Sequence, residues 1–203
     1  MEIKDTYKTI ESPSEEILFK EKNSKFFGYA FPVSTTDEIK IHIDQLKKQH
    51  FGAVHFCYAY QIGTEKIEFR ANDDGEPSNS AGIPIYGQIQ SFGLTNILIV
   101  VVRFFGGTKL GVGGLITAYK TTAQLVLENA SIIEKTIDVQ FKITFDYKNI
   151  NKVMRIIKEK QLEIHSQKME ENCELLIVTR KKNAERIFDI FDALFEISIS
   201  KLD

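Results

Sequence analysis

The segment at residues 96–119 constrains the fold more than any other part of the chain. It begins with six consecutive aliphatic residues, 97–102, and such a run predicts a strand that is covered on both faces. Five glycines then fall within residues 106–114, where they free the backbone for left-handed conformations and close approach. A helical pattern of apolar residues starts at Leu115. We therefore expect a buried strand, a glycine-rich loop and a helix in succession.

The glycine-rich loop is a candidate anion site, because unpaired N–H groups point out of a helix N-terminus. The spacing matches neither standard phosphate motif: no glycine precedes Lys109, as a P-loop requires, and Ile116 stands where the dinucleotide pattern needs glycine. The alternative interpretation is that the glycines only let a strand and a helix pack closely. The candidate ligand-binding residues of this segment are Arg103, Gly106, Gly107, Lys109, Gly111, Gly113 and Gly114.

Three carboxylates, Asp73, Asp74 and Glu76, fall within four residues of a polar loop. They could hold a metal or act as an acid and base, although adjacent carboxylates need not face one another. A second interpretation is a turn whose Asp side chains bond their own backbone and cap the next helix. A third is that these carboxylates pair with Arg103 or Lys109 and hold the glycine loop in shape. We include all three acids among the candidate ligand-binding residues.

Histidine and cysteine give weaker signals. The two cysteines, Cys57 and Cys173, lie far apart and outside any Cys-x-x-Cys pair, which argues against a disulfide scaffold or a zinc site. His55 shares a strand face with Cys57 and could join the acidic cluster, so it is also a candidate ligand-binding residue. A nucleophilic Cys57–His55 pair is a distant alternative, because two such positions are merely adjacent. We predict no catalytic residue, no metal ligand and no cofactor.

Composition sets few limits on function. The net charge of −2 in 203 residues supplies no global attraction to nucleic acid, although it does not exclude a local basic groove. The N-terminus lacks an apolar segment of signal-peptide length, and no apolar run is long enough to span a membrane. We therefore expect a cytoplasmic protein without membrane contact.

Hydrophobic periodicity predicts an α+β protein with a mostly antiparallel first sheet. A capping box at residues 35–38 marks the start of the first helix, and Ser78, Asn79 or Ser80 could cap the second. The expected elements of residues 1–131 are two strands within 15–33, a helix at 36–50, strands at 54–62 and 66–70, a helix at 81–90, the strand from 96 and the helix from 115.

The rest of the chain, residues 132–203, is expected to form a second domain, because all 12 glycines and all 4 prolines lie before residue 115. Its pattern predicts a strand at 134–145, a helix around 150–157, strands at 162–168 and 173–179, a helix around 184–191 and a strand at 195–200. This β-α-β-β-α-β order is that of the ferredoxin-like split motif.

Five segments of the first domain stand out together: Lys25-Phe26-x-Gly28-Tyr29, His55-x-Cys57-x-Ala59-Tyr60, Asp73-Asp74-Gly75-Glu76-Pro77-Ser78, Ala81-Gly82-x-Pro84-Ile85, and residues 103–115 followed by Ala118-Tyr119. With these motifs the sequence resembles the IMPACT family, and its whole length looks like the bacterial YigZ type. The resemblance covers roughly residues 15–130, and Thr117 departs from it, because relatives often have an arginine there.

The resemblance implies a first domain with the fold shared by a ribosomal small-subunit protein and elongation factor G, followed by a ferredoxin-like domain. Eukaryotic members regulate translation by binding the activator of a starvation-responsive initiation-factor kinase, through an N-terminal domain that this sequence does not show. We expect a non-enzymatic cytoplasmic regulator of translation or stress response that binds RNA, the ribosome or a protein partner. The alternative is a phosphate- or nucleotide-binding enzyme that uses the glycine loop with metal-binding carboxylates.

Overall fold

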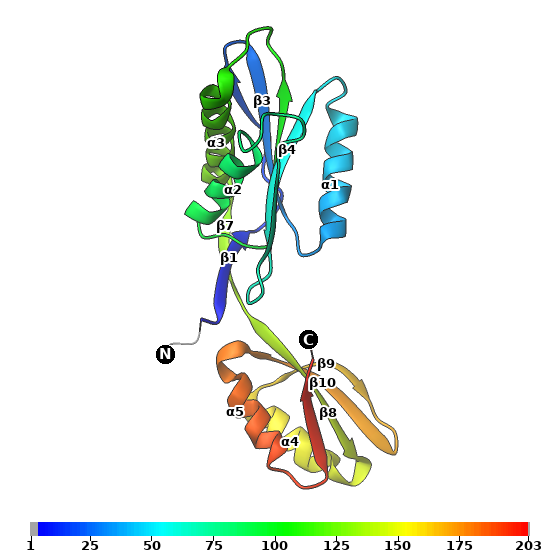
Figure 1. The fold of residues 1–203 in the computed structure, drawn as a ribbon. Helices are drawn as coiled ribbons and strands as arrows, with labels where there is room; N and C mark the ends of the chain where they lie inside the picture. Colours follow the sequence, from blue (N-terminus) through cyan, green and yellow to red (C-terminus); the bar gives the residue numbers. More distant parts are fainter. Residues whose placement is uncertain (1–3, 203) are drawn as a thin grey trace. The chain divides into compact units, whose positions relative to one another are not determined.

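The computed structural model describes residues 4–202, and the chain divides into two compact units (Figure 1). The first unit is Tyr7–Lys135. The second begins at Thr136 and includes the described N-terminal residues 4–6. The α+β class expected from periodicity is confirmed, with several sheets and five α-helices in the described chain. None of these helices combines the length and apolar character that a membrane crossing requires.

The first unit is built on a five-stranded antiparallel sheet with the strand order β2-β3-β6-β4-β5. Helix α1 lies on one face, and helices α2 and α3 lie on the other (Figure 1). The strands are β2 (Ile17–Glu21), β3 (Ser24–Pro32), β4 (His55–Ile62), β5 (Glu68–Asn72) and β6 (Ile97–Phe104), and the helices are α1 (Thr36–Gln49), α2 (Gly82–Ser91) and α3 (Gly111–Asn129).

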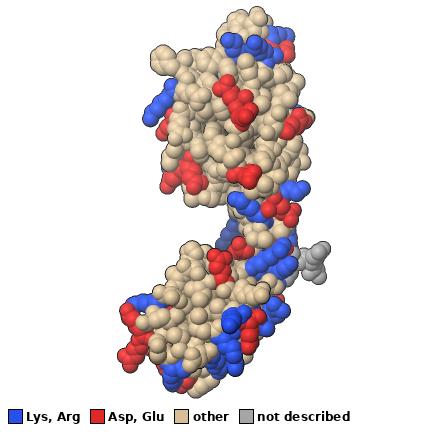
Figure 2. Space-filling view, turned by 180° about the vertical axis from the view of Figure 1, so that it is seen from behind, with Lys and Arg blue, Asp and Glu red and all other residues tan. Residues whose placement is uncertain are grey.

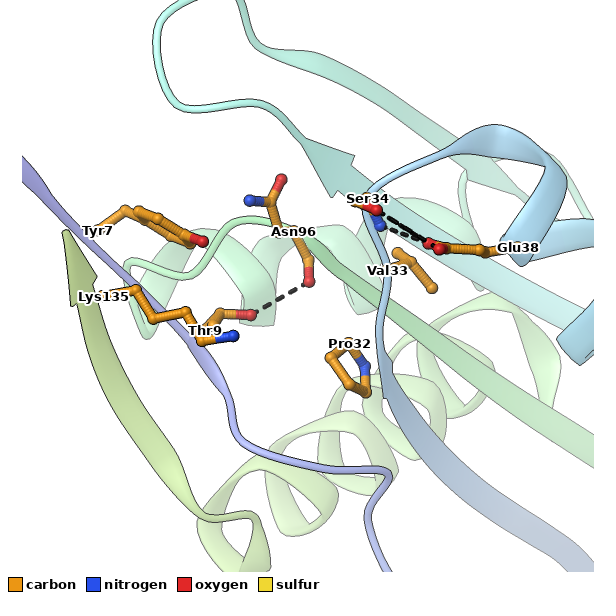
Figure 3. A pocket seen from close by; sticks show the side chains of 8 residues that line it. All are labelled: Tyr7, Thr9, Pro32, Val33, Ser34, Glu38, Asn96 and Lys135. Atoms are coloured by element: carbon orange, nitrogen blue, oxygen red, sulfur yellow. Dashed lines mark hydrogen bonds between the residues drawn. The ribbon is translucent and has the colours of Figure 1, made fainter. Parts of the chain in front are cut away.

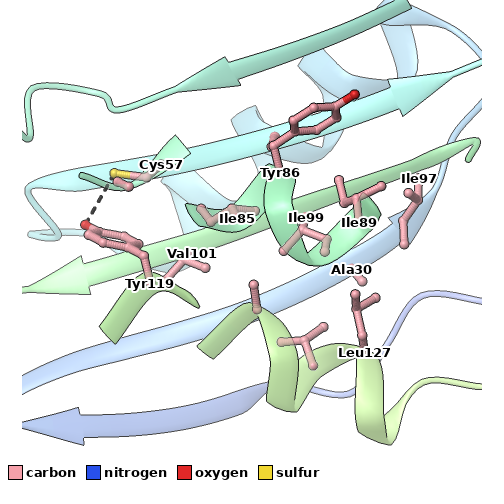
Figure 4. Packing of buried hydrophobic residues seen from close by; sticks show 14 of the residues in the cluster. Ala30, Cys57, Ile85, Tyr86, Ile89, Ile97, Ile99, Val101, Tyr119 and Leu127 are labelled. Carbon is pink, nitrogen blue, oxygen red and sulfur yellow. Dashed lines mark hydrogen bonds between the residues drawn. The ribbon is translucent and has the colours of Figure 1, made fainter. Parts of the chain in front are cut away.

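The central strand β6 separates two hydrophobic cores. Ile97, Ile99 and Val101 contact the α2/α3 core, whereas Leu98 and Val100 contact the α1 core. All of them are fully buried, as the continuous aliphatic run predicts for a strand covered on both faces. Figure 4 shows the α2/α3 core, in which side chains from the sheet and both helices interdigitate.

Two further strands, β1 (Thr6–Ile10) and β7 (Ile132–Thr136), pair with each other in a separate two-stranded sheet. The sequence predicted neither as a separate element. The single strand expected at residues 134–145 is wrong: it is divided at Ile137 into β7 and β8. The Ile137 N–H donates to Asp5 O at 2.8 Å, and its carbonyl accepts from Lys181 N at 2.8 Å, so the chain leaves one sheet and enters another at this residue.

The second unit contains a four-stranded antiparallel sheet with the order β11-β8-β10-β9. Alternate residues of β8 and β10 are buried against α4 and α5, which gives the unit its own core. Its elements are β8 (Asp138–Asp146), the 3-10 turn η1 (Tyr147–Asn149), α4 (Ile150–Lys160), β9 (Glu163–Lys168), β10 (Asn172–Arg180), α5 (Lys181–Asp192) and β11 (Ile197–Lys201).

Helix α3 starts earlier than the sequence predicts. The expected start was Leu115, but the helix begins at Gly111, so Gly113 and Gly114 lie in its first turn. Burial of Leu115 and Tyr119 against the sheet stabilises the helix and overrides the low helix propensity of glycine. The residues between β6 and α3 are therefore a short loop at 105–110.

Candidate functional site

A buried ion pair between Glu76 and Arg103 lies at the centre of the candidate site. The Arg103 Nη1 is 2.6 Å from Glu76 Oε1, and the two side chains are 6% and 4% exposed. Tyr119 donates its hydroxyl proton to the same carboxylate oxygen at 2.8 Å. The Arg103 guanidinium also lies 5.5 Å from the Phe26 ring centroid and 5.6 Å from that of Phe105. The cation therefore has a carboxylate partner and two aromatic neighbours.

The β2–β3 turn fixes the start of the glycine-rich loop. Ser24 Oγ accepts from Gly106 N at 3.2 Å, and it lies 3.4 Å from Arg103 Nη2. A Cβ atom on Gly106 would fall 2.1 Å from the backbone carbon of Asn23, so no larger residue fits without moving the backbone. Gly106 thus supports the loop instead of facing a ligand.

The acidic loop uses its first carboxylate as a helix cap. Asp73 Oδ1 accepts from Ala81 N at 3.0 Å and from Gly82 N at 2.8 Å, and Oδ2 accepts from Asn79 N at 2.8 Å. These bonds satisfy N–H groups at the start of α2. The expectation that Ser78, Asn79 or Ser80 caps α2 is wrong, because Ala81 holds the cap position and Ser80 bonds Pro77 O instead.

The second carboxylate holds the edge of β4. Asp74 Oδ2 accepts from Phe56 N at 2.7 Å, and Asp74 O lies 2.7 Å from His55 Nδ1. His55 Nε2 is in turn 3.8 Å from Glu76 Oε1. The three carboxylates therefore have three different sets of partners. Within residues 4–202, no three His, Cys, Asp or Glu side chains assemble in a way that would hold a metal ion.

Cys57 belongs to the same buried network. Its Sγ donates to Asp73 O at 3.0 Å and lies 3.3 Å from Tyr119 Oη, and Figure 4 shows the contact with Tyr119. Burial is the main cause that raises the pKa of the Cys57 thiol well above its ordinary value. Burial likewise raises the pKa of the Tyr119 hydroxyl. A thiol that stays protonated at neutral pH is a poor nucleophile, so the geometry favours a structural role for Cys57.

An open cavity of about 340 Å³ lies beside this network, and we call it the α3 groove. Phe105 and Val112 are about half exposed in it, at 51% and 52%. Gly111 begins α3 with φ +73°, and Leu110 at the cap position makes no side-chain cap. The groove is lined by Glu76, Pro77, Arg103, Phe105, Lys109, Leu110, Gly111, Val112 and Leu115.

A second hollow of about 290 Å³ lies on another side of the same helix start. Gly113, Gly114 and Thr117 line it together with Phe19, Glu21 and Ala118. A Cβ atom on Gly113 would meet no atom within 4 Å, whereas one on Gly114 would lie 3.1 Å from Leu110 Cβ. A side chain at Gly113 would thus extend into free space at this hollow, whereas one at Gly114 would crowd Leu110.

Exposed lysines surround this end of the first unit. Lys20, Lys22 and Lys25 lie on the β2–β3 hairpin, and Lys25 pairs across the sheet with Phe104, next to Phe105. Lys109 is exposed at the groove itself. In the described part of the chain, these four lysines form no ion pair. Figure 2 shows basic side chains at the end of this unit where the hairpin turn lies.

Another cavity of the first unit, about 190 Å³, is lined in part by polar groups that have partners within the fold (Figure 3). Thr9 Oγ1 donates to Asn96 O at 3.1 Å. Glu38 Oε2 accepts from Ser34 N at 2.6 Å and, within the α1 capping box, from Thr35 N at 3.2 Å. Thr9 and Glu38 therefore serve the fold in this cavity.

The structure divides the sequence-predicted residues into two groups. Arg103, Lys109, Gly111 and Glu76 line the α3 groove, and Gly113 and Gly114 shape its helix. Asp73, Asp74, His55 and Gly106 bond backbone groups or pack behind the groove, and Gly107 takes φ +84° in the loop. The predicted pairing of an acidic-loop carboxylate with Arg103 is confirmed for Glu76.

Sequence reasoning missed Phe105, Pro77, Tyr119 and Ser24. Phe105 carried a usable signal, because a phenylalanine directly after a buried strand and before two glycines has no obvious core to enter. Tyr119 carried one as part of the Ala118-Tyr119 motif, but its contact with Glu76, 43 positions away, did not show in the sequence, and neither did that of Ser24 with Arg103, 79 positions away.

Fold and site together define a two-unit α+β protein whose first unit holds an open groove beside a buried ion-pair network. The family profile described as "Impact N-terminal domain" matches residues 22–127. YvyE, an IMPACT family member of Bacillus subtilis (strain 168), is 34% identical over 177 residues, which cover 87% of this chain and 81% of YvyE. The chain therefore belongs to the IMPACT family.

Two other relatives agree with that assignment. An IMPACT family member of Haemophilus influenzae is 33% identical over 180 residues, with 85% of this chain and 86% of the relative covered. YigZ of Escherichia coli (strain K12) is 28% identical over 138 residues, with 67% and 68% covered, and the resemblance to the YigZ type is thus confirmed. A solved structure described as a hypothetical protein shares the fold, with a TM-score of 0.75, 21% identity and 99% of both chains covered.

Proposed function

We propose that this protein regulates translation by binding, and that the α3 groove with its surrounding lysines holds the RNA backbone of a ribosomal partner. Membership of the IMPACT family supports a role in translation, because eukaryotic members are regulators of that process. Such a role would place the protein in the cytoplasm, as its sequence predicts.

The observation that carries the proposal is the combination of groups at the groove. Lys109 supplies a positive charge, and the start of α3 adds the positive end of a helix dipole without a side-chain cap. Phe105 offers a half-exposed ring next to these positive groups. Phosphates bind cations and helix N-termini, and bases stack on exposed aromatic rings, so one nucleotide step of RNA fits this arrangement.

The neighbouring lysines extend the same surface. Lys20, Lys22 and Lys25 belong to the hairpin whose turn packs against Gly106, so their charges lie near the groove. A row of cations tracks a polymeric phosphate backbone better than it fits a single small anion. This favours RNA over a free phosphate or nucleotide as the ligand of the groove.

Binding to purified ribosomes and to ribosomal RNA should be measured as a function of salt. Each phosphate contact adds about 0.7 to 0.9 to the slope of log K against log salt concentration. Lys109→Ala should weaken binding and reduce this slope by about that amount. Lys47→Ala is the matched control, because Lys47 is also exposed but lies in the last turn of α1, on the other face of the sheet.

Absence of binding at low salt would overturn the proposal, and so would equal effects of Lys109→Ala and Lys47→Ala. Binding that does not depend on salt would point instead to a protein partner held by the apolar groove residues.

The enzyme alternative has less support. Asp73 and Asp74 accept backbone N–H groups with their carboxylates, which leaves them poorly placed to bind a metal. A nucleotide bound at the α3 groove would raise the unfolding temperature of the protein. A ligand present at a hundred times its dissociation constant adds about 2.7 kcal/mol of stability. A thermal-shift screen of nucleotides with divalent ions tests this alternative directly.

In this proposal the two units are the two domains expected from the sequence, although the units divide between Lys135 and Thr136 and the sequence put the boundary after residue 131. The strand order β11-β8-β10-β9 and the two helices on one core support a ferredoxin-like assignment for the second. The relation of the first unit to the ribosomal-protein and elongation-factor fold stays an expectation from the family resemblance.

A further inference from the structure

We propose that two copies of this chain pair along strand β5, so that their five-stranded sheets continue across a two-fold axis. The proposal is independent of RNA binding, because β5 and the α3 groove contain different residues.

Strand β5 is an outermost strand of its sheet. It pairs with β4 on one side, and in the described chain no strand pairs with its other side. An outer strand presents backbone N–H and C=O groups that a second strand can use. Strand β2 is the other outermost strand of the sheet and pairs with β3 alone among the described strands. It therefore serves as a comparison for β5 within the same molecule.

Large apolar side chains are exposed along β5, where soluble proteins normally place charges. Phe69 is 54% exposed and stacks on Tyr86 of α2, with ring centroids 4.5 Å apart. Ile83, one helical turn from Tyr86, is 47% exposed, and Ile67, immediately before β5, is 49% exposed. These side chains belong to the α2 face of the sheet. They form an apolar patch that continues the edge.

The charges of β5 complement a second copy of the same strand. On the other face of the sheet, Glu68 and Arg70 flank Phe69. An antiparallel pair centred on Phe69 would place each Glu68 directly opposite Arg70 of the second copy, and each Ile67 opposite Ala71. Side chains directly opposite in such a pair lie close enough to interact, and opposite charges there are favourable. Arg70 forms no ion pair within the described chain.

The neighbouring registers are worse. A pair centred on Arg70 would bring the two Arg70 side chains together, and one centred on Glu68 would bring the two Glu68 side chains together. A pairing whose two-fold axis falls between two successive residues, such as Phe69 opposite Arg70, would bring together side chains from opposite faces of the two sheets, because side chains alternate along a strand. Charge and alternation therefore select the pair centred on Phe69. The resulting interface is isologous, as in most homodimers.

Analytical ultracentrifugation of the full chain tests the proposal. The wild type should sediment as a dimer, and Glu68→Arg and Arg70→Glu should each weaken dimerisation by about tenfold or more, because each makes like charges face one another. Mixing these two variants should restore a dimer, since every facing pair then has opposite charges. A simple folding defect in either variant would not be repaired by mixing.

Disulfide trapping provides the second measurement. Opposite residues of an antiparallel pair have Cα atoms about 4.5 to 5.5 Å apart, which suits a disulfide. Phe69→Cys should therefore form a covalent dimer on mild oxidation, while Leu18→Cys, at an exposed position of the β2 edge, should not. A wild type that remains monomeric up to about 1 mM would overturn the proposal. So would equal cross-linking at both edges, or a mixture of the charge variants that stays monomeric.

Discussion

The buried Glu76–Arg103 pair leads to a quantitative prediction about stability. Arg103→Met keeps much of the side-chain volume but leaves Glu76, 4% exposed, with only the Tyr119 hydroxyl and the more distant His55 as polar partners. Removing one partner of a buried ion pair costs about 3 to 5 kcal/mol, because an uncompensated charge remains. Glu76→Gln leaves the guanidinium of Arg103 in the same position, so we expect a cost at the lower end of that range.

The double variant Arg103→Met/Glu76→Gln should cost less than the sum of the two single changes. It contains no buried charge at this site, and the Gln oxygen can still accept from Tyr119. Residues in direct contact show coupling energies of about 0.5 to 3 kcal/mol, and a pair 2.6 Å apart belongs at the upper end. The exposed pair Lys40–Asp37 of α1 is the control, and Lys40→Met should change the stability little.

Hydrogen exchange with peptide-level mass spectrometry in increasing urea is the appropriate assay, because the chain has two compact units. Peptides from residues 7–135 should lose their protection from exchange at a lower urea concentration in both single variants than in the wild type. Peptides from residues 138–201 serve as an internal reference. Additive effects of Arg103→Met and Glu76→Gln, within about 0.5 kcal/mol, would refute the reasoning. They would mean that the pair is solvated and contributes no mutual stabilisation.

Three further predictions concern other buried groups. Gly28→Ala should destabilise the first unit by about 1 to 3 kcal/mol, because the new Cβ would lie 2.5 Å from Val126 Cγ2, and Val126→Ala should reduce that cost in urea titrations. Burial lowers the pKa of His50, so near pH 6.5 the unfolded chain binds more protons than the folded chain. The urea midpoint of unfolding should therefore fall as the pH drops through that value. His50→Gln should flatten this pH dependence, and the control His165→Gln should leave it unchanged. Cys57 should react with iodoacetamide only as fast as the first unit opens, as seen by intact mass, and rapid alkylation of the folded protein would contradict its raised pKa.

Alternation along β4 shows which part of the fold the sequence specifies well. Period-two patterning of the sequence at residues 54–62 places Phe56 and Tyr60 on one face of the strand and Cys57 and Ala59 on the other. The structure confirms this, since the first pair packs in the α1 core and the second in the α2/α3 core. Such patterns are reliable because a shift of one residue would expose every apolar side chain of the strand.

Contacts between distant residues were not predictable in the same way. The sequence indicated that Asp side chains of this loop could cap α2, beside Ser78, Asn79 or Ser80, but it did not show that Asp73 alone reaches Ala81 N from eight positions earlier. The sequence likewise indicated that an acidic-loop carboxylate could pair with Arg103 or Lys109, but not that Glu76 would be the one that does. Its burial depends on Arg103, 27 positions away, and on Tyr119, 43 positions away.

Burial also changes the role that the sequence suggested for Arg103. A guanidinium 2.6 Å from a carboxylate acts on a ligand mainly as a dipole, so its attraction falls off faster with distance than that of an isolated charge. Lys109 is exposed and has no such partner in the described chain, and it keeps its full charge at the groove. Arg103→Met should therefore affect stability more than RNA affinity, whereas Lys109→Ala should affect RNA affinity more than stability. Measuring both quantities on both variants separates the support of the groove from its binding surface. The opposite ranking would make Arg103 the ligand-binding residue that the sequence first suggested.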